Sequence, residues 1–393
     1  MIETEAAGIA LDTDYPELRD AVAKVCTDFP GEYWRELDDN VEYPTEFVKA
    51  MTHHGYLSSL IPEEYGGSGL PIRAAAVILE TIHATGCSAA ACHAQMYTMG
   101  TVLRHGNDDQ KQDYLPKIAS GELRLQAFGV SEPTTGSNTT QLQTRADRDG
   151  DEYVVNGQKI WTSRVEHSDL MLLLARTTPA DQVEKRTAGI STFLVDLREA
   201  KGKSIDIRPI KTMINHHTTE VHFDDFRIPA SSLIGEEGKG FYYILDGMNA
   251  ERILLAGEAI GNARYFIRRA VDYANERIVF DRPIGQNQGV QLPIARVYAE
   301  TEAADLMARK AATMFDSGIP CGAEANMSRL LTAEASWNAA EVCFETFGGF
   351  AFACEYDIER KWRETRLSRT APISTNLVLT HIAQHVLGLP RSY

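Results

Sequence analysis

Several polar residues in this 393-residue chain have the types and neighbours needed for acid–base chemistry on a bound ligand. Glu251 and Arg252 are adjacent in the segment MNAERILLAG, and Glu258 follows seven residues later. A carboxylate that is buried beside apolar groups has a raised pKa and can act as a general base near neutral pH. Glu-Arg pairs are also common on solvated helix faces, so the pair alone permits both interpretations. Glu258 lies on about the same helical face and is an alternative base.

Four further stretches contain residue types that suit ligand binding. The glycines Gly136, Gly348 and Gly349 would let the backbone approach a ligand closely. The guanidinium of Arg277 could bond a pyrophosphate through two parallel hydrogen bonds. Taken singly, each stretch also has an ordinary structural explanation, such as a polar turn, a core tryptophan or a solvated arginine. The stretches are FGVSEPTTGSN (128–138), KIWTS (159–163), NERIVFDRPIGQNQ (275–288) and ETFGGFA (345–351).

The elements that must position these residues fall into three parts, predicted at residues 1–124, 125–235 and 236–393. The first part has helical periodicity over 44–57 and 71–106, and Pro44 and Pro71 stand where helices often begin. The second part consists of short runs rich in β-branched and aromatic residues, and Asn156-Gly157 predicts a hairpin turn between two of them. The third part is again helical. The pattern predicts an α+β fold.

The composition of the chain excludes some kinds of binding partner and cellular location. The net charge of -16 argues against a nucleic-acid partner, because phosphate binding needs a basic face. No apolar run approaches the ~20 residues of a membrane span, and the N-terminal residues lack the pattern of a signal peptide. The six cysteines and eleven histidines show no metal-site spacing, so we expect reduced thiols, no metal and a cytoplasmic location.

The order of the three parts and of the four stretches closely resembles the acyl-CoA dehydrogenase family, from Ile61 to Ser374. The resemblance implies an N-terminal helical domain, a central β-barrel or sandwich and a C-terminal four-helix bundle. It also implies an FAD-dependent α,β-dehydrogenation of an acyl-CoA thioester, a homotetramer, and an electron-transfer flavoprotein as the electron acceptor. The chain has no Rossmann glycine motif, so FAD would be held by this fold's own loops.

The resemblance also implies residue roles. The Ser131 hydroxyl would donate to flavin N1 and O2, Trp161 would cover the flavin, and Ser163 would face N5. Relatives use the loop matching 345–351 to contact the FAD of a neighbouring subunit. The chain departs from the family pattern at Asn138, where aspartate is usual, and at Glu345, where glutamine is usual. The implied cofactor contacts are Phe128, Val130, Ser131, Trp161, Ser163, Arg277, Phe280, Gln288, Glu345, Gly348, Gly349, Ser374 and Asn376; the implied substrate contacts are Ser137, Met248, Asn249 and Arg252.

The position of the catalytic base separates two arrangements within the family. Many members carry a glutamate in a loop near the C-terminus, where this chain has Pro372 and no carboxylate between Arg366 and Asn376. In isovaleryl-CoA dehydrogenase and its long-chain relatives, the glutamate precedes an arginine on the long helix after the β-domain, which here is Glu251. Proline has no N–H to offer the thioester oxygen. Either Ile373 donates instead, or a ribityl hydroxyl of the flavin contributes more.

Three alternatives remain open at this point. The thioester could belong to an acyl-carrier protein rather than CoA, since no adenine-site motif is evident. The same fold also occurs in flavin monooxygenases and oxidases, which the absence of a C-terminal glutamate would fit. A catalytically silent partner subunit is the third alternative, suggested by Pro372 and Glu345. The substrate could be a branched or bulky acyl group, although relatives with this arrangement also take straight long chains.

Overall fold

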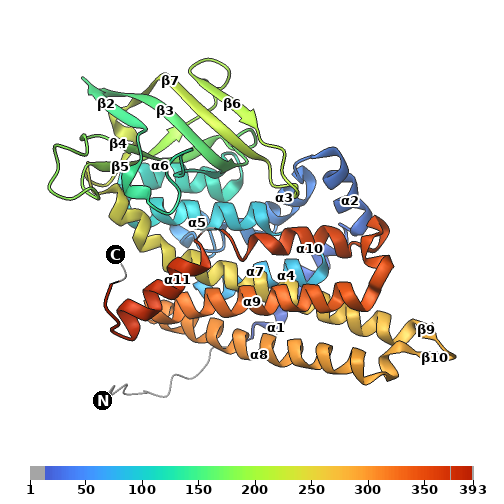
Figure 1. Ribbon diagram of the computed structural model, residues 1–393. Helices are drawn as coiled ribbons and strands as arrows, with labels where there is room; N and C mark the ends of the chain where they lie inside the picture. The colour runs from blue at the N-terminus through green and yellow to red at the C-terminus, as the bar shows by residue number, and fades with distance from the viewer. Residues whose placement is uncertain (1–13, 372, 392–393) are drawn as a thin grey trace. The chain divides into compact units, whose positions relative to one another are not determined.

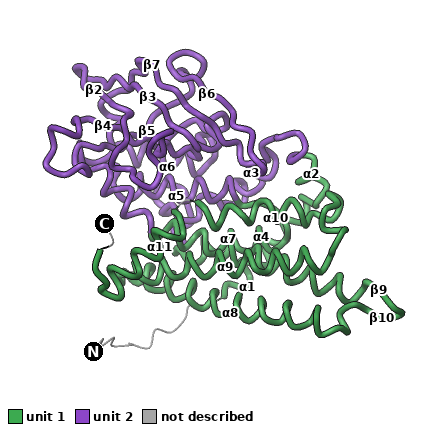
Figure 2. The backbone as a smooth tube through the Cα atoms, viewed as in Figure 1, with its two compact units in different colours: residues 1–36, 71–89, 249–393 green, residues 37–70, 90–248 purple. Residues whose placement is uncertain are grey.

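The computed structural model describes residues 14–371 and 373–391. Helices precede and follow a β-region along the chain, so the predicted α+β fold is confirmed (Figure 1). The chain divides into two compact units that are described separately (Figure 2). Unit 1 takes in the chain up to Glu36, residues 71–89 and everything from Asn249 onward, and unit 2 takes in 37–70 and 90–248. These units follow spatial contacts, whereas the predicted boundaries follow changes of secondary structure, so the two divisions differ.

An eight-stranded sheet dominates unit 2, in the order β6-β7-β3-β2-β4-β5-β8, with β1 paired in parallel to β4. Its core contains Tyr153, Phe193 and Phe223, and every residue of β4 is buried. The strands coincide closely with the predicted β-branched and aromatic runs. They are β1 (Leu125–Gly129), β2 (Arg145–Asp149), β3 (Glu152–Ser163), β4 (Leu170–Arg176), β5 (Ile190–Asp196), β6 (Ile205–Pro209), β7 (Thr218–Pro229) and β8 (Leu233–Ile234).

The predicted hairpin at Asn156-Gly157 is wrong. Both residues lie inside β3, which continues to Ser163, and the turn that joins β2 to β3 lies at 150–151 instead. The pairing of β3 with β7 shifts register between Val155 and Gly157. Gly157 has φ 146°, and a Cβ there would lie 2.7 Å from Cα of Thr144. The glycine therefore serves a bulge and a close backbone approach rather than a turn.

Three helices of unit 2 accompany the sheet: α3 (Thr45–His53), α5 (Ala90–His105) and α6 (Asp108–Ser120). As predicted, α3 begins directly after Pro44. Helix α6 begins with a capping box, in which Asn107 accepts from the N–H of Gln110 and the Gln110 side chain accepts from the N–H of Asn107. Helix α5 supplies buried residues to the same core as β1 and β4.

Unit 1 is helical apart from a short hairpin of β9 (Ile278–Val279) and β10 (Arg282–Pro283). Its longest helix, α7, begins in unit 2 and runs for 37 residues. The helices are α1 (Pro16–Cys26), α2 (Gly31–Asn40), α4 (Ile72–Thr85), α7 (Gly240–Glu276), α8 (Gln288–Asp316), α9 (Gly322–Phe347), α10 (Ile358–Leu367) and α11 (Thr375–His381).

Two glycines allow α7 to pack closely on α4. A Cβ at Gly257 would lie 2.5 Å from the carbonyl oxygen of Ala76, and a Cβ at Gly261 would collide with the carbonyl oxygen of Glu80. The glycines are four residues apart and therefore share one helical face. Because the colliding atoms belong to the backbone, a larger residue would force the helices apart. This contact fixes the helix that carries Glu251 and Glu258.

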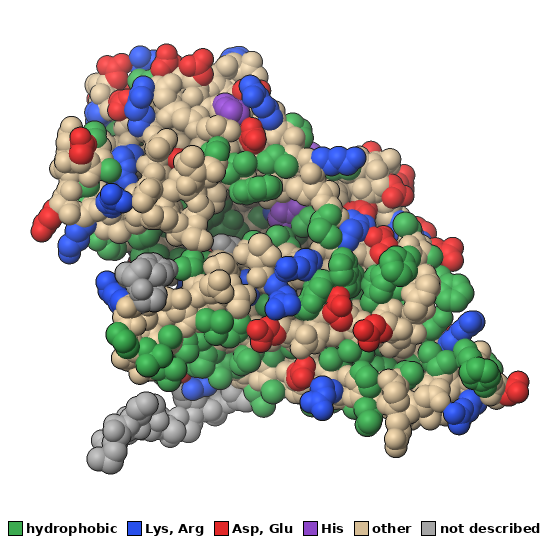
Figure 3. Space-filling model, viewed as in Figure 1, with side chains coloured by type: hydrophobic (Ala, Val, Ile, Leu, Met, Phe, Trp, Pro, Cys, Tyr) green, Lys and Arg blue, Asp and Glu red, His purple; other side chains and the backbone are tan. Residues whose placement is uncertain are grey.

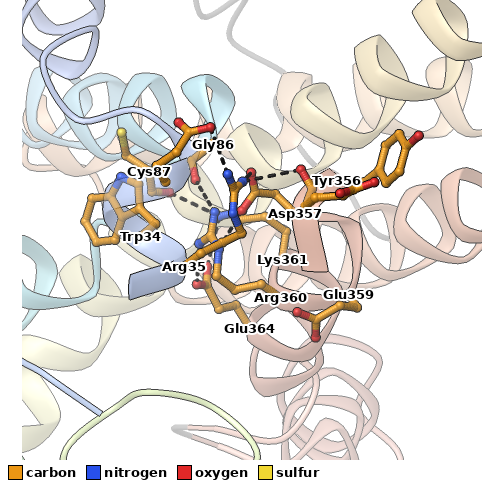
Figure 4. A network of polar contacts seen from close by, with 12 residues as sticks. Trp34, Arg35, Gly86, Cys87, Tyr356, Asp357, Glu359, Arg360, Lys361 and Glu364 are labelled. Atoms are coloured by element: carbon orange, nitrogen blue, oxygen red, sulfur yellow. Dashed lines mark hydrogen bonds and ion pairs between the residues drawn. The ribbon is translucent and has the colours of Figure 1, made fainter. Parts of the chain in front are cut away.

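A buried polar network fixes α10 (Figure 4). Lys361 is fully buried, and its Nζ donates to the carbonyl of Cys87 at 3.1 Å and to Glu364 at 3.0 Å. Arg360 bonds Glu364 at 2.9 Å and the carbonyl of Gly86 at 3.1 Å. The two cations hold the pKa of Glu364 at about 2, although burial alone would raise it. Helix α10 is therefore held firmly over its first two turns.

Candidate functional site

The first two predicted stretches lie side by side in unit 2. The carbonyl of Ser131, just after β1, accepts a hydrogen bond of 2.9 Å from the N–H of Ile160 in β3. This bond brings Val130 and Ser131 next to the segment that carries Trp161 and Ser163. Neither the Ser131 nor the Ser163 hydroxyl has a hydrogen-bond partner within the described parts of the chain, so both can donate to a ligand.

A buried ion pair that the sequence did not reveal anchors this loop. Nζ of Lys159 lies 2.7 Å from Glu132 and also donates to the carbonyl of Val130 at 3.2 Å. Glu132 further accepts from the N–H groups of Gln143 and Thr144, which closes the loop 132–144. Burial lowers the pKa of Lys159 to about 8. Burial alone would raise the pKa of Glu132, but Lys159 and the two N–H donors hold it below its usual value.

Trp161 has an unusual backbone. Its φ is 60°, which is rare for a bulky residue, and the register of β3 against β7 shifts between Lys159 and Thr162. A bulge at this point turns the side chain out of the ladder and leaves it 60% exposed. Strained backbone conformations of this kind cluster at ligand sites. The bulge presents a flat apolar surface beside Ser163.

Glu251 lies on α7 in unit 1 among cationic side chains. Burial raises the pKa of its carboxyl to about 7, and the charges of Arg252 and Arg329 act in the opposite direction. Nη1 of Arg252 donates to Oδ1 of Asn249 at 3.1 Å. Met248 lies one turn before Arg252 on the same helix. A carboxylate that titrates near neutrality is suited to accept a proton.

Arg329 is a buried residue whose charge acts on Glu251 and which no sequence motif indicated. It lies on α9 and is 2% exposed. Its Nη2 donates to the carbonyls of Ala371 at 3.1 Å and Ile373 at 3.3 Å. The only sequence signal was a lone arginine in an otherwise small-residue helical face, which is too weak to assign. Pro372, predicted to replace the loop glutamate, lies outside the described residues.

The third stretch lies at the far end of α7. Arg277 follows the last residue of the helix, and its guanidinium lies 5.5 Å from the ring of Phe350. Phe280, at the tip of the β9–β10 hairpin, is 93% exposed with φ 52°, and Gln288 is exposed at the start of α8. Glu251 and Arg277 are 26 residues apart, which corresponds to about 39 Å along the helix. The two residues therefore cannot belong to one compact site.

The fourth stretch ends α9 beside the third. Gly348 has φ 57° and ψ -129°, a conformation that essentially only glycine adopts, and Gly349 follows it in a 3-10 turn. The exposed Glu345 lines a pocket of about 400 Å³. Trp362 in that pocket donates to Glu341 at 2.6 Å. The pocket is lined by Glu341, Phe344, Glu345, Phe352, Glu359, Trp362 and Arg363.

Four predicted residues have other surroundings. Ser374 is the N-cap of α11 and accepts from the N–H of Leu377 at 3.4 Å, and Asn376 is exposed in the first turn of that helix. Ser137 is exposed in the loop 132–144, and Phe128 packs edge-on against Tyr97.

The alternative base, Glu258, is engaged elsewhere. Its carboxylate lies 3.5 Å from Nε2 of His83, whose Nδ1 faces Nζ of Lys361 at 3.0 Å. It therefore joins the buried network that holds α10.

Comparison with known proteins identifies the fold. The acyl-CoA dehydrogenase N-terminal, middle and C-terminal domain profiles match residues 12–122, 127–226 and 238–387. The chain is 36% identical over 379 residues to acyl-CoA dehydrogenase fadE12 of Mycobacterium bovis, a match that covers 96% of both chains. The chain belongs to the acyl-CoA dehydrogenase family. This membership confirms the predicted activity, an FAD-dependent α,β-dehydrogenation of an acyl-CoA thioester, and the alternatives are not favoured.

Solved structures of the acyl-CoA dehydrogenase fold agree. The glutaryl-CoA complex of glutaryl-coenzyme A dehydrogenase matches with a TM-score of 0.89 and 27% identity, covering 98% of this chain and 97% of that one. PigA with FAD and proline matches with a TM-score of 0.88 and 25% identity, covering 97% and 99% of the two chains. The family membership and these neighbours confirm the predicted cofactor, FAD.

The described residues fit FAD. The Ser131 and Ser163 hydroxyls and the exposed face of Trp161 form a donor and stacking set in unit 2. Arg277 and the glycine turn at 348–349 suit a pyrophosphate. Among the residues with described positions, no group of three or more His, Cys, Asp or Glu side chains could hold a metal. In the same part of the chain, no helix has the length and apolarity to cross a membrane.

Proposed function

We propose that Glu251 is the catalytic base, which removes the α-proton of the acyl-CoA thioester onto its carboxylate. The observation that carries this proposal is a half-buried carboxylate on α7 whose pKa burial raises to about 7. FAD, when bound, supplies the acceptor for the hydride that leaves the β-carbon. The products are then the α,β-unsaturated thioester and the protonated base: the α-proton goes to the carboxylate, and the β-hydride carries the electron pair to the acceptor.

The flavin is held by the unit 2 loop. Ser131 donates from the segment after β1, Ser163 donates from β3, and Trp161 covers one face of the ring. The Glu132–Lys159 pair supports this arrangement because it locks both segments together. Phe128 and Val130 belong to the same strand and loop and would complete the contact.

The thioester carbonyl must be polarised while the α-proton leaves, since an unactivated α-proton is too weakly acidic. Ile373 or a ribityl hydroxyl is the donor, because a proline at 372 has no N–H. Met248, Asn249, Arg252 and Ser137 are the residues proposed to contact the substrate. The base on the long helix favours a branched or bulky acyl group.

The active assembly is a homotetramer in the cytoplasm. Support comes from the distance of about 39 Å along α7 between Glu251 and Arg277, which exceeds the length of an extended FAD. Arg277, Phe280, Gln288 and the loop at Gly348 would therefore serve the FAD of a second copy. Apolar side chains gather over α8 and α9 on the face in Figure 3, and Leu292, Tyr298 and Leu306 of α8 are each more than half exposed. An electron-transfer flavoprotein reoxidises the flavin.

Anaerobic flavin bleaching with butyryl-, isovaleryl- and palmitoyl-CoA tests the proposal. Wild type should bleach with at least one acyl-CoA, and Glu251→Gln should not, although it keeps the volume of the side chain and binds FAD. Glu258→Gln is the matched control on the same helix and should still bleach. Bleaching that survives Glu251→Gln and is lost in Glu258→Gln would move the base to Glu258.

A further inference from the structure

The loop 368–374 connects α10 to α11 and carries no carboxylate, yet it is held from two sides. On the α10 side, the N–H groups of Thr370 and Ala371 bond the carbonyl of Leu367 at 2.9 and 3.0 Å. On the other side, Nη2 of Arg329 bonds the carbonyls of Ala371 and Ile373. A single guanidinium nitrogen therefore bridges the two carbonyls that flank position 372.

Only one edge of this guanidinium is used by the loop. Nε and Nη1 of Arg329 are buried and have no hydrogen-bond partner among the described residues. An unsatisfied buried donor costs about 1–3 kcal/mol, more when it is charged. Part of the charge of this buried guanidinium can therefore act on neighbouring groups other than the loop.

The charge of Arg329 acts on Glu251. Two cations face this carboxylate: Arg252 from α7 and Arg329 from α9. Arg252 in turn faces the Cys321 thiol before α9 and His381 on α11. Burial lowers the pKa of Arg329 to about 10, so its guanidinium stays charged at neutral pH. Without it, burial would hold Glu251 protonated to a higher pH.

We propose that Arg329 is a positioning residue: Nη2 of its guanidinium holds Ala371 and Ile373 on either side of position 372, and the charge of the same buried guanidinium acts on the Glu251 carboxylate. This inference rests on the proposed role of Glu251 as the base. The proposal links two features of the sequence, the absence of a carboxylate from the loop and the arginine on α9. Because the loop carries no carboxylate, a cation can lie next to it. The same cation then supports the carboxylate on α7.

The test compares Arg329→Met, which keeps volume and loses charge, with Arg329→Lys, which keeps charge. The pH profile of kcat/KM is measured for the acyl-CoA that bleaches the wild-type flavin fastest, with an artificial acceptor. Arg329→Met should move the acidic midpoint upward by about one pH unit, which lowers kcat/KM at pH 7 about fivefold. At alkaline pH, kcat/KM should still rise to a plateau. Arg329→Lys should retain the wild-type midpoint.

Hydrogen exchange supplies the second measurement, on the FAD-loaded protein. Peptides covering 368–376 should exchange faster in Arg329→Met than in wild type. Arg73→Met is the matched control, because Arg73 is equally buried but faces Glu80 and Asp305 rather than Glu251. That control should leave both the midpoint and the loop exchange unchanged, even if it lowers stability.

The outcomes separate the two proposals. If Glu251→Gln abolishes bleaching but Arg329→Met leaves both the midpoint and the loop exchange at wild-type values, the role of Arg329 is refuted and Glu251 stands. If Glu251→Gln still bleaches, the base assignment has failed, whatever Arg329 does. A midpoint that moves equally in Arg329→Lys and Arg329→Met would also refute the charge argument, since lysine retains the cation.

Discussion

Replacing Glu251 with glutamine should stabilise the protein at alkaline pH while it removes activity. Burial raises the pKa of the Glu251 carboxyl from an ordinary value of 4.5 to about 7. The native state therefore resists ionisation of this group more strongly than the unfolded chain does. The two values differ by about 2.5 pH units, which corresponds to about 3 kcal/mol of native-state destabilisation once the group is fully ionised.

The sign and the pH window follow from proton binding. Between pH 4.5 and 7, the native state holds the Glu251 proton and the unfolded state has released it. The contribution of this group to the free energy of unfolding therefore falls as pH rises. Its cost is about 1 kcal/mol at pH 5 and about 3 kcal/mol at pH 8. Glutamine does not titrate, so the stability of Glu251→Gln relative to wild type should rise by about 2 kcal/mol between these two pH values.

Urea unfolding of the FAD-saturated protein at pH 5, 6.5 and 8 measures this difference, with protein concentration held constant because an oligomer's stability depends on it. Glu258→Gln is the control and should be less stable than wild type, since it loses the contact with His83. A Glu251→Gln difference that stays constant from pH 5 to pH 8 would refute the raised proton affinity of Glu251. That result would also refute the argument that the pKa of this carboxyl suits a base.

Three further substitutions test the supporting structure. Trp161→Ala should weaken FAD binding about tenfold or more, because the ring loses its stacking partner. The unfolding of the apoprotein should change little, because the Trp161 side chain is exposed. Equilibrium titration with FAD measures the affinity, and an unchanged affinity would contradict the stacking role. Lys159→Met should cost about 3–5 kcal/mol in urea unfolding, because it leaves Glu132 buried without its cation, and a loss below 1 kcal/mol would contradict this. Gly261→Ala should cost about 1–3 kcal/mol by pushing α7 from α4, and an unchanged unfolding midpoint would show that the helices can adjust.

Local sequence patterns predicted most of the elements. The strands β4 to β7 lie in the part predicted to be rich in β-structure, and the helices α7, α8 and α9 lie in the part predicted to be helical, because alternating and helical periodicities report which face is buried. The hairpin at Asn156-Gly157 failed because the same dipeptide also suits a bulge, and only the pairing of β3 with β7 decides between the two. Turn chemistry is local, whereas register is not.

The supporting contacts of the site were not predictable in the same way. Lys159 and Glu132 stand inside two of the recognised stretches, but nothing in either stretch states that they pair. Arg329 lies 78 positions from Glu251 and more than 40 from the loop carbonyls that it bonds. Such contacts arise when distant elements pack together. A single sequence reports which residues could carry charge, but not which other groups face them.

A base on a helix makes different demands on the protein from a base on a loop. Glu251 belongs to a 37-residue helix that Gly257 and Gly261 hold tightly against α4, so its position does not depend on the order of the C-terminal loop. A buried carboxylate on such a rigid helix cannot move toward solvent to ionise, and fixed cations must provide that stabilisation instead. Arg252 comes from the same helix, whereas Arg329 is brought by α9 and bonded to the loop. Under the two proposals made above, one guanidinium couples the order of the loop to the proton affinity of Glu251.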